Sequence, residues 1–511
     1  MSTSDTQLRR TLTTPKIVFL VIAAAAPLAA MVGTVPLAFA IGDGAGVPAM
    51  FVFAGLTLLF FSVGYAAMSR RIVNAGGFYT YLAGGLGKPV AVAGGVIAVI
   101  SYNAATIGLV GAFGYFAQLV GEAHGLKLPW QVWAGVAVVA VAVLGYRQID
   151  LSAKVLSILM VAEIGVLAVL DVAVFAHKGA ATLPATSFHP HTVFSGGLGV
   201  AMMFAFISFI GFESAALYGE ETRNPRRSVP MATYVSVIVI SVFYALTSWV
   251  AVGAVGADKV TQVAGEQLGM LFFGLSDTYV GSAATTVLQI LLCTSLFAAT
   301  LALHNAANRY TFALGRERVL PRALGVVHRK HQSPHRASLV QTVLTVILVG
   351  VFALAGLDPY TNLATAMLGL GTLGIIVLQA GAALSVVFFF RNRPERHWWR
   401  TIVAPVLGVI GLVTATVLVV RNFDVLTGTH AVVVTALPWL LLAAAVVGVI
   451  YTLWMRSARP DRYAGLAAVQ IREDDDTPAE AAPAAEAAPA AAEPEPAATP
   501  EPALEPAHSA D

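Results

Sequence analysis

Apolar stretches of about 20 residues recur along almost the whole chain, and this is the length that an α-helix needs to cross a bilayer. The sequence is 57% hydrophobic and 11% charged, with a mean hydropathy of +0.77. Inside lipid, every backbone polar group needs a partner within the protein, which such runs satisfy as helices. We therefore expect an all-α integral membrane protein.

Twelve spans are predicted from these runs. Eleven of them cover about 17–41, 47–68, 90–120, 132–146, 151–175, 229–255, 282–305, 338–356, 363–390, 402–420 and 431–454, and the sixth span is entered near residue 194. A short interfacial helix is expected after the second span, and an external loop with a short helix at 256–281.

The lysines and arginines are distributed unevenly between the two sides of this threading. If the N-terminus is cytoplasmic, four of the 30 basic residues lie in outer segments, namely Lys127, Lys178, Lys259 and Arg421. Cytoplasmic loops carry the excess of basic residues in membrane proteins. We therefore expect both termini in the cytoplasm and the chain in the cell membrane.

The two ends of the chain differ from the apolar part. Residues 1–16 are expected to form a short cytoplasmic N-terminus. Residues 456–511 are expected to be a cytoplasmic Ala/Pro/Glu-rich disordered tail, because they offer too little apolar surface to fold. The single cysteine, Cys293, excludes an intrachain disulfide, and no metal or cofactor is expected.

The stretch 202–230, MMFAFISFIGFESAALYGEETRNPRRSVP, combines a helix-weakening glycine with a carboxylate inside a membrane span. Gly211 weakens the helix, and Glu213 is costly in lipid unless it faces protein or water. The first span contains Pro27, Gly33 and Pro36, which also loosen a helix. Both spans are predicted to be broken near mid-membrane, although small-residue packing with a carboxylate that snorkels to the cytosol is the alternative.

Two broken helices separated by one set of five spans are expected when inverted repeats face each other across a substrate site. Half-helix N-termini favour an anionic ligand group, and unwound carbonyls can hold a cation. A zwitterion that carries a carboxylate and an ammonium suits such a site.

Three motifs then resemble the amino acid–polyamine–organocation superfamily of permeases. They are SFIGFESAALYGEETRNPRRSVP in the sixth span, GGFYTYLAGGLG after the second span, and FAATLALHNAANRYTFALGRERVLPRALGVVHRKHQSPHRA in and after the eighth. The resemblance implies a LeuT-like fold of two inverted five-helix repeats with broken first and sixth helices, plus two extra helices. It places repeat 1 at 17–176, repeat 2 at 192–390 and the extra spans at 401–455.

The resemblance also implies a substrate site. Phe209, Ile210, Gly211 and Phe212 match the unwound part of the sixth helix, where the family holds the substrate amine through backbone carbonyls. In the first helix the break is centred on 26–30, with Ala26, Pro27, Leu28 and Ala29 as binding residues in place of a glycine-rich run. Ile207 stands where some members place a gating aromatic, with Phe206 or Phe209 as substitutes.

Four residues are candidates for ion or proton coupling. Glu213 matches a family carboxylate implicated in proton handling. Glu163 stands where many proton-coupled members carry a lysine, and it is interpreted as a proton carrier or a sodium ligand, with a structural interhelical hydrogen bond as the alternative. Thr294 and Ser295 lie at the depth of the family's sodium ligands, and interhelical hydrogen bonds between small residues are an equal alternative.

Tyr102 and Asn103 are weaker candidates for the pocket wall, with a packing role as the alternative. His304 and Asn305 are interpreted as a helix end, and His328, His331 and His335 as loop charge. Glu220 and Glu221 are expected to pair with Arg226, Arg227 or the loop after the eighth span.

The function predicted from these observations is a permease for amino acids or related small amines. Proton-coupled symport by alternating access is expected, with Na⁺ as the alternative coupling ion. An exchanger or an amine, polyamine or ethanolamine carrier of the same fold is the first alternative, and a membrane-embedded enzyme or sensor is the second. No Walker A motif or ATPase domain indicates primary transport, and no cluster of catalytic groups favours a membrane-embedded enzyme. The oligomeric state is left open.

Overall fold

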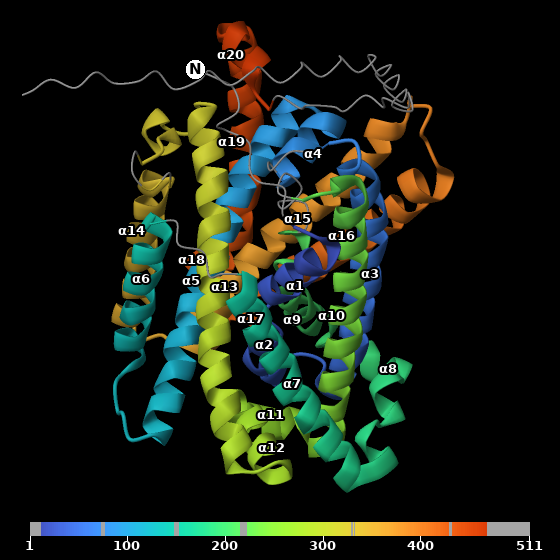
Figure 1. Cartoon of the computed structure of the whole chain (residues 1–511), viewed down its shortest axis with the longest axis vertical. Helices are drawn as coiled ribbons and strands as arrows, with labels where there is room; N and C mark the ends of the chain where they lie inside the picture. The colour runs from blue at the N-terminus through green and yellow to red at the C-terminus, as the bar shows by residue number, and fades with distance from the viewer. Residues whose placement is uncertain are drawn as a thin grey trace, which may run out of the picture. The chain divides into compact units, whose positions relative to one another are not determined.

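The computed structural model of the chain describes residues 12–72, 77–147, 153–214, 222–328, 331, 333–428 and 432–467. Within these residues, eleven helices are long and apolar enough to cross a membrane, and a twelfth, shorter apolar segment covers Leu198–Ser214. This agrees with the number of spans predicted from the sequence. Figure 1 shows the helices.

The first span consists of two helices, α1 (Thr14–Ala24) and α2 (Pro27–Ile41). The other spans of the first repeat are α3 (Val47–Ser69), α5 (Lys88–Ala123), α6 (Trp130–Arg147) and α7 (Ala153–Lys178). The short interfacial helix expected after the second span is α4 (Gly77–Leu86).

The second repeat begins with α9 (Leu198–Ser208), the first part of the sixth span. Its other spans are α10 (Pro225–Val255), α13 (Ser282–Arg316), α14 (His335–Leu354) and α15 (Thr365–Phe390), the last preceded by a π-helical turn, η7 (Pro359–Ala364). The two extra spans are α16 (Ala404–Arg421), which follows a second π-helical turn, η8 (Trp398–Val403), and α19 (Leu437–Ala458).

Short helices occupy the connections at one end of the spans. The loop after α7 contains η2 (Gly179–Thr182), η3 (Ala185–Phe188) and α8 (Pro190–Val193), and the loop after α10 contains α11 (Val260–Gln267), η5 (Leu268–Met270) and α12 (Leu271–Tyr279). Helices α8, α11 and α12 lie at the opposite end from α4 and α20 (Pro460–Gly465) in Figure 1. The loop at 256–281 therefore holds more helix than the sequence suggested.

The broken helices lie among the longest helices of the chain. Helix α5 packs against α13, α15 and α19, and α3 packs against α10 and α16. Helix α1 packs on α10, and α2 packs on α9. Because neighbouring helices cover them, the unwound peptide groups of the breaks can be satisfied by protein partners and are kept away from lipid.

The residues after the last span continue as ordered structure. The tail predicted from residue 456 begins within α19, and α20 follows it; the rest of that prediction, 468–511, lies outside the described residues. The Lys88 ammonium donates to the carbonyls of Tyr463 and Ala464 at 2.9 and 2.6 Å. The Ala467 amide donates to Glu317 at 3.2 Å, so this segment is bound to α5 and to the residue that follows α13.

Candidate substrate and coupling site

The first helix is interrupted at Ala25 and Ala26. Ala26 has a positive φ of 47°, which costs an L-residue energy, and Pro27 then starts α2 at a position that needs no amide donor. The Tyr244 hydroxyl on α10 donates to the Ala25 carbonyl at 3.3 Å. The break is shorter than the predicted 26–30, since Pro27, Leu28 and Ala29 already belong to the first turn of α2.

The sixth helix leaves the α conformation after Ser208, and Gly211 adopts a φ of 105°. A Cβ atom at Gly211 would lie 2.7 Å from the carbonyl oxygen of Ala24. Only glycine fits both the φ angle and this approach. The two breaks therefore touch each other, and the predicted interruption at Gly211 is found.

Glu213 is folded back onto the break in its own segment. Its carboxylate accepts hydrogen bonds from the Gly211 amide at 3.0 Å and from the Tyr102 hydroxyl at 2.8 Å. The Tyr65 hydroxyl donates to the Glu213 carbonyl at 3.2 Å. Glu213 thus fixes the unwound segment between α3 and α5.

Glu163 lies at the other break. Its carboxylate accepts hydrogen bonds from the Leu28 amide at 3.3 Å, in the first turn of α2, and from the Ser295 hydroxyl of α13 at 2.8 Å. A carboxylate is favoured at a helix N-terminus by the exposed amides and the dipole. The structure therefore brings two of the coupling candidates, Glu163 and Ser295, together, whereas the Thr294 hydroxyl donates to the Leu291 carbonyl of its own helix.

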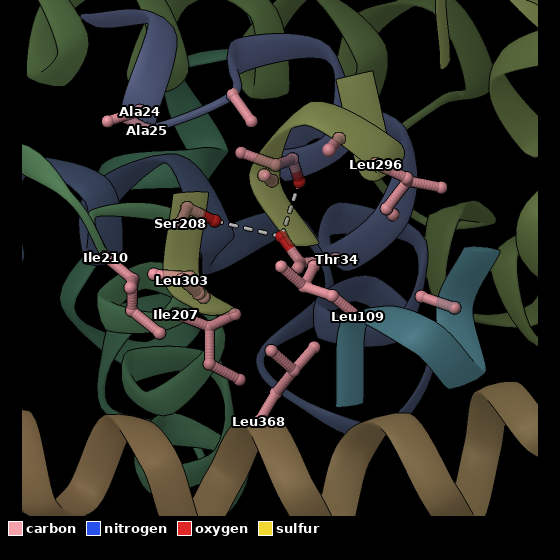
Figure 2. A pocket seen from close by; sticks show the side chains of 16 residues that line it. Ala24, Ala25, Thr34, Leu109, Ile207, Ser208, Ile210, Leu296, Leu303 and Leu368 are labelled. Carbon is pink, nitrogen blue, oxygen red and sulfur yellow. Dashed lines mark hydrogen bonds between the residues drawn. The ribbon is translucent and has the colours of Figure 1, made fainter. Parts of the chain in front are cut away.

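A cavity of about 50 Å³ lies between the two breaks. Only two of the side chains that line it are polar, Thr34 of α2 and Ser208 of α9, and their hydroxyls are 2.9 Å apart, as Figure 2 shows. The other lining residues are Ala24, Ala25, Ala26, Ala29, Ala30, Gly33, Leu109, Ala112, Ile207, Ile210, Leu296, Ala299, Leu303 and Leu368.

The predicted binding residues divide into two groups. Ala26, Ala29 and Ile210 line the cavity, as does Ile207, the residue at the position of the gating aromatic. Pro27 and Leu28 lie in the first turn of α2, directly after the first break, and Phe209, Gly211 and Phe212 lie in the second break. The Tyr102 side chain reaches Glu213, and the Asn103 amide donates to the Val99 carbonyl of its own helix at 2.7 Å, so neither is a wall residue.

Sequence reasoning missed most of the apolar wall and both hydroxyls. A signal was present around the start of α2, where Ala26, just before the helix, and Ala30 and Gly33, within it, follow helical spacing in the sequence. The helices α5, α13 and α15 contribute four leucines to the wall: Leu109, Leu296, Leu303 and Leu368. Within an apolar run, the sequence does not show which leucines face a cavity.

A further contact joins the two broken spans at their ends near α11. Asp43, after α2, accepts a hydrogen bond from the Ser195 hydroxyl, before α9, while its Oδ2 atom finds no hydrogen-bond partner among the described residues. Burial raises the pKa of Asp43 to about 6, and the Ser195 hydrogen bond partly opposes this.

Of the weaker candidates, His304 is buried inside α13, which extends beyond it to Arg316, and its ring lies 2.9 Å from the Ser338 hydroxyl. It is therefore not a helix end. The rings of His328, His331 and His335 gather around Tyr146. Within the described ranges, no group of three or more His, Cys, Asp or Glu is arranged to hold a metal. Glu220 and Glu221, predicted to pair with nearby arginines, lie outside the described residues.

Two interrupted membrane helices that face each other across a small cavity define a carrier with a substrate site inside the bilayer. The sequence profile of one family, described as amino acid permease, matches residues 12–453. The chain belongs to this amino acid permease family.

Two similar proteins are named as carriers of amino acids or amines. The chain is similar to the branched-chain amino acid permease BcaP of Bacillus subtilis, 26% identical over 70% of this chain and 76% of that protein. It is also similar to the low-affinity putrescine importer PlaP of Escherichia coli K12, 25% identical over 78% of this chain and 84% of the importer. The solved structure of MhsT with L-phenylalanine matches with a TM-score of 0.57 and 14% identity, and covers 82% of this chain and 99% of MhsT.

These findings confirm the fold class and the broad function. The chain is an all-α, multi-pass membrane protein of the LeuT-like fold and a secondary transporter for amino acids or amines. It is not an enzyme, since the family and its relatives are transporters.

Proposed function

We propose that this protein carries a neutral amino acid with a small or branched apolar side chain across the cell membrane, together with a proton, by alternating access. The observation that carries the proposal is the cavity between the two helix breaks, where peptide groups and aliphatic side chains form almost the whole wall. The carboxylate, the ammonium and the side chain of the substrate are each assigned to a different part of this site.

The substrate carboxylate is assigned to the start of α2. The amides of the first turn of a helix lack partners inside the helix. Pro27 has no amide and the Leu28 amide already donates to Glu163, so Ala29 is the remaining donor of this first turn. The substrate ammonium is assigned to the carbonyls of the second break, at 209–211, where the positive φ of Gly211 redirects the peptide groups. No charged side chain is then needed for either group.

The side-chain subsite is apolar. Four leucines and Ile207 face the cavity, and its only hydroxyls, Thr34 and Ser208, are bonded to each other. The volume corresponds to about three to five water-sized spheres, which suits a short aliphatic side chain.

A diamine is the second candidate substrate, because one relative imports putrescine. Its second ammonium would need an acidic partner, since burying an unpaired charge is costly. The two carboxylates nearest the helix breaks, Glu163 and Glu213, do not line the cavity. The lining thus favours the amino acid.

Glu163 supplies a physical route to proton coupling. It and a substrate carboxylate would face the same end of α2, since Glu163 already accepts a hydrogen bond from Leu28. Two anions about 5.5 Å apart repel by about 3 kcal/mol at an effective dielectric constant of about 20. The substrate therefore binds more tightly when Glu163 is protonated, and by linkage the substrate promotes proton binding to the same degree.

The direction of the proposed transport follows from charge. The end that carries α4 and α20 has the basic loops, which the positive-inside rule assigns to the cytoplasm. The end with α11 and α12 then faces outward, and a proton gradient directed inward drives import.

The test is uptake into proteoliposomes with pH and sodium gradients imposed separately. Unlabelled leucine, valine and alanine should compete with labelled leucine, while lysine and putrescine should not. Glu163→Gln and Glu213→Gln should each abolish proton-driven uptake, and Glu266→Gln, on α11 outside the site, serves as the matched control.

Each result bears on a separate part of the proposal. Full gradient-driven uptake by both glutamine variants would contradict the coupling assignment. Competition by putrescine but not by leucine would contradict the substrate assignment.

A further inference from the structure

A second buried carboxylate, Asp171, lies in the same span as Glu163, and the transport scheme above does not use it. Asp171 is 9% exposed and accepts a hydrogen bond from the Thr247 hydroxyl of α10 at 2.7 Å. Ionisable side chains within membrane spans are costly and usually belong to substrate, ion or proton pathways. Asp171 therefore requires a functional explanation.

Glu163 and Asp171 lie on the same side of α7. They are eight residues apart, which places them on one helical face and about 12 Å apart along the axis. Leu167, between them, is completely buried, so this face is turned into the protein.

On the side of α10 that faces α7, two hydroxyl groups lie between Asp171 and the first helix break. Tyr244 precedes Thr247 by three residues and thus shares its face. Its hydroxyl donates to the Ala25 carbonyl in the first helix break, three residues before Leu28, whose amide binds Glu163. Asp171, Thr247 and Tyr244 therefore connect the outer half of α7 with the break.

The facing sides of α7 and α10 form the α7–α10 seam, and Lys178 fixes its outer end. Its ammonium, at the end of α7, donates to the Gly253 and Ala254 carbonyls of α10 at 3.0 and 2.6 Å. Asp171 lies about two turns below this end, between the assigned outer surface and Glu163.

We propose that Asp171 is a proton-binding residue of the transport reaction, which takes a proton from the outer solution and passes it along the α7–α10 seam toward Glu163. The proposal rests on proton coupling at Glu163. The Asp171 carboxylate binds a proton from a hydronium ion, the hydroxyls of Thr247 and Tyr244 and intervening water conduct it, and the Glu163 carboxylate receives it. Asp171 then returns to the ionised form, and no other bond changes.

Few other titratable groups lie near Asp171 in the outer half of the membrane. Helix α2 and η2 contain none. On the described parts of α7 and of the other helices packed against it, the groups in the same half of the membrane or at its middle are Glu163, His177, Lys178, Tyr244, Asp277, Tyr279 and Cys293.

The test compares Asp171→Asn, which keeps the shape and the Thr247 contact, with Asp277→Asn on the exposed side of α12 as the matched control. Initial uptake driven by an imposed pH gradient should fall by about tenfold or more in Asp171→Asn, because a proton acceptor is lost. Counterflow at equal pH, which needs no proton transfer along the seam, should stay near the wild-type rate. Asp171→Glu should restore the driven rate in part.

Thr247→Val provides a second variant, since it leaves the carboxylate and removes its hydroxyl partner. It should slow driven uptake and change its dependence on external pH, with counterflow preserved. A wild-type pH profile in Asp171→Asn and Thr247→Val, or an equal loss of driven uptake and counterflow in both, would overturn the proposal.

The same assay separates this proposal from the proposed function. Proton-driven uptake that is lost in Glu163→Gln but normal in Asp171→Asn overturns the role of Asp171 alone. Wild-type protein that shows no pH-driven uptake overturns coupling itself, and the role of Asp171 with it.

Discussion

Replacing Gly211 by alanine tests whether the two helix breaks need to touch. Gly211 has a φ of 105°, and an L-residue in the positive region costs about 1–2 kcal/mol. The new Cβ atom would also lie 2.7 Å from the oxygen and 2.9 Å from the carbon of the Ala24 carbonyl. Both are backbone atoms of the first break, so they cannot rotate away, and overpacking of this kind costs about 1–3 kcal/mol.

Together these effects should destabilise the touching arrangement by about 2–5 kcal/mol, and the lower value already reduces the equilibrium constant for this arrangement by about 30-fold. We expect uptake by Gly211→Ala in proteoliposomes to fall. The thermal unfolding midpoint in detergent should also decrease.

Gly350→Ala is the matched control. Gly350 lies within α14 and lacks a positive φ, and a Cβ atom added there would meet no other atom within 4 Å. Alanine is favoured over glycine in a helix, so this variant should be at least as stable as the wild type. Equal uptake and equal midpoints for the Gly211 and Gly350 variants would refute the close packing of the two breaks.

Three other predictions concern single side chains. Because burial raises the pKa of Asp43 to about 6, the buried carboxyl favours the folded state most when it is protonated, below about pH 4, and this stability is lost as the pH rises through 6. Asp43→Asn, which cannot ionise, should flatten that part of the curve of unfolding midpoint against pH. Tyr102→Phe leaves one Glu213 oxygen without its hydroxyl donor, so the unfolding free energy should fall by about 1–3 kcal/mol, measured by denaturant titration. Thr34→Val removes half of the polar lining, so competition by serine relative to leucine should weaken, whereas unchanged inhibition constants would count against Thr34 as a wall residue.

The sequence predicts the spans well because each is a long apolar run with polar ends. It also locates the sixth-helix break, since Gly211 and Glu213 are both out of place in an ordinary membrane helix. The first break is less well defined: Pro36 lies inside the continuous helix α2, while the interruption occurs at two alanines that no propensity distinguishes. Alanine favours helix, so the break at Ala25 and Ala26 depends on Pro27, which disfavours the helical conformation of the residue before it, and on the tertiary contact of Tyr244.

The candidate site shows the same limit. Glu163 and Ser295 were each predicted as coupling candidates, because polar groups in membrane spans seek partners, but their contact with each other was not predicted. Tyr102 was expected at the cavity wall but reaches Glu213, since a fully buried hydroxyl binds the strongest acceptor within reach. The side chain of a leucine points to the cavity or away from it according to how its helix is rotated about its axis. When all faces of a helix are apolar, the sequence does not show this rotation.

The hydrogen bonds that hold residues 463–467 have a practical consequence for handling the protein. Lys88 and Glu317, in two different parts of the helix bundle, form hydrogen bonds with this segment. Leu466 and Ala467 of the segment are buried against the bundle. A reporter or affinity tag fused directly behind α19 would displace this anchor and expose the apolar surface beneath it. Truncated or tagged versions of the protein should therefore keep the sequence through Ala467 and attach foreign domains only beyond it.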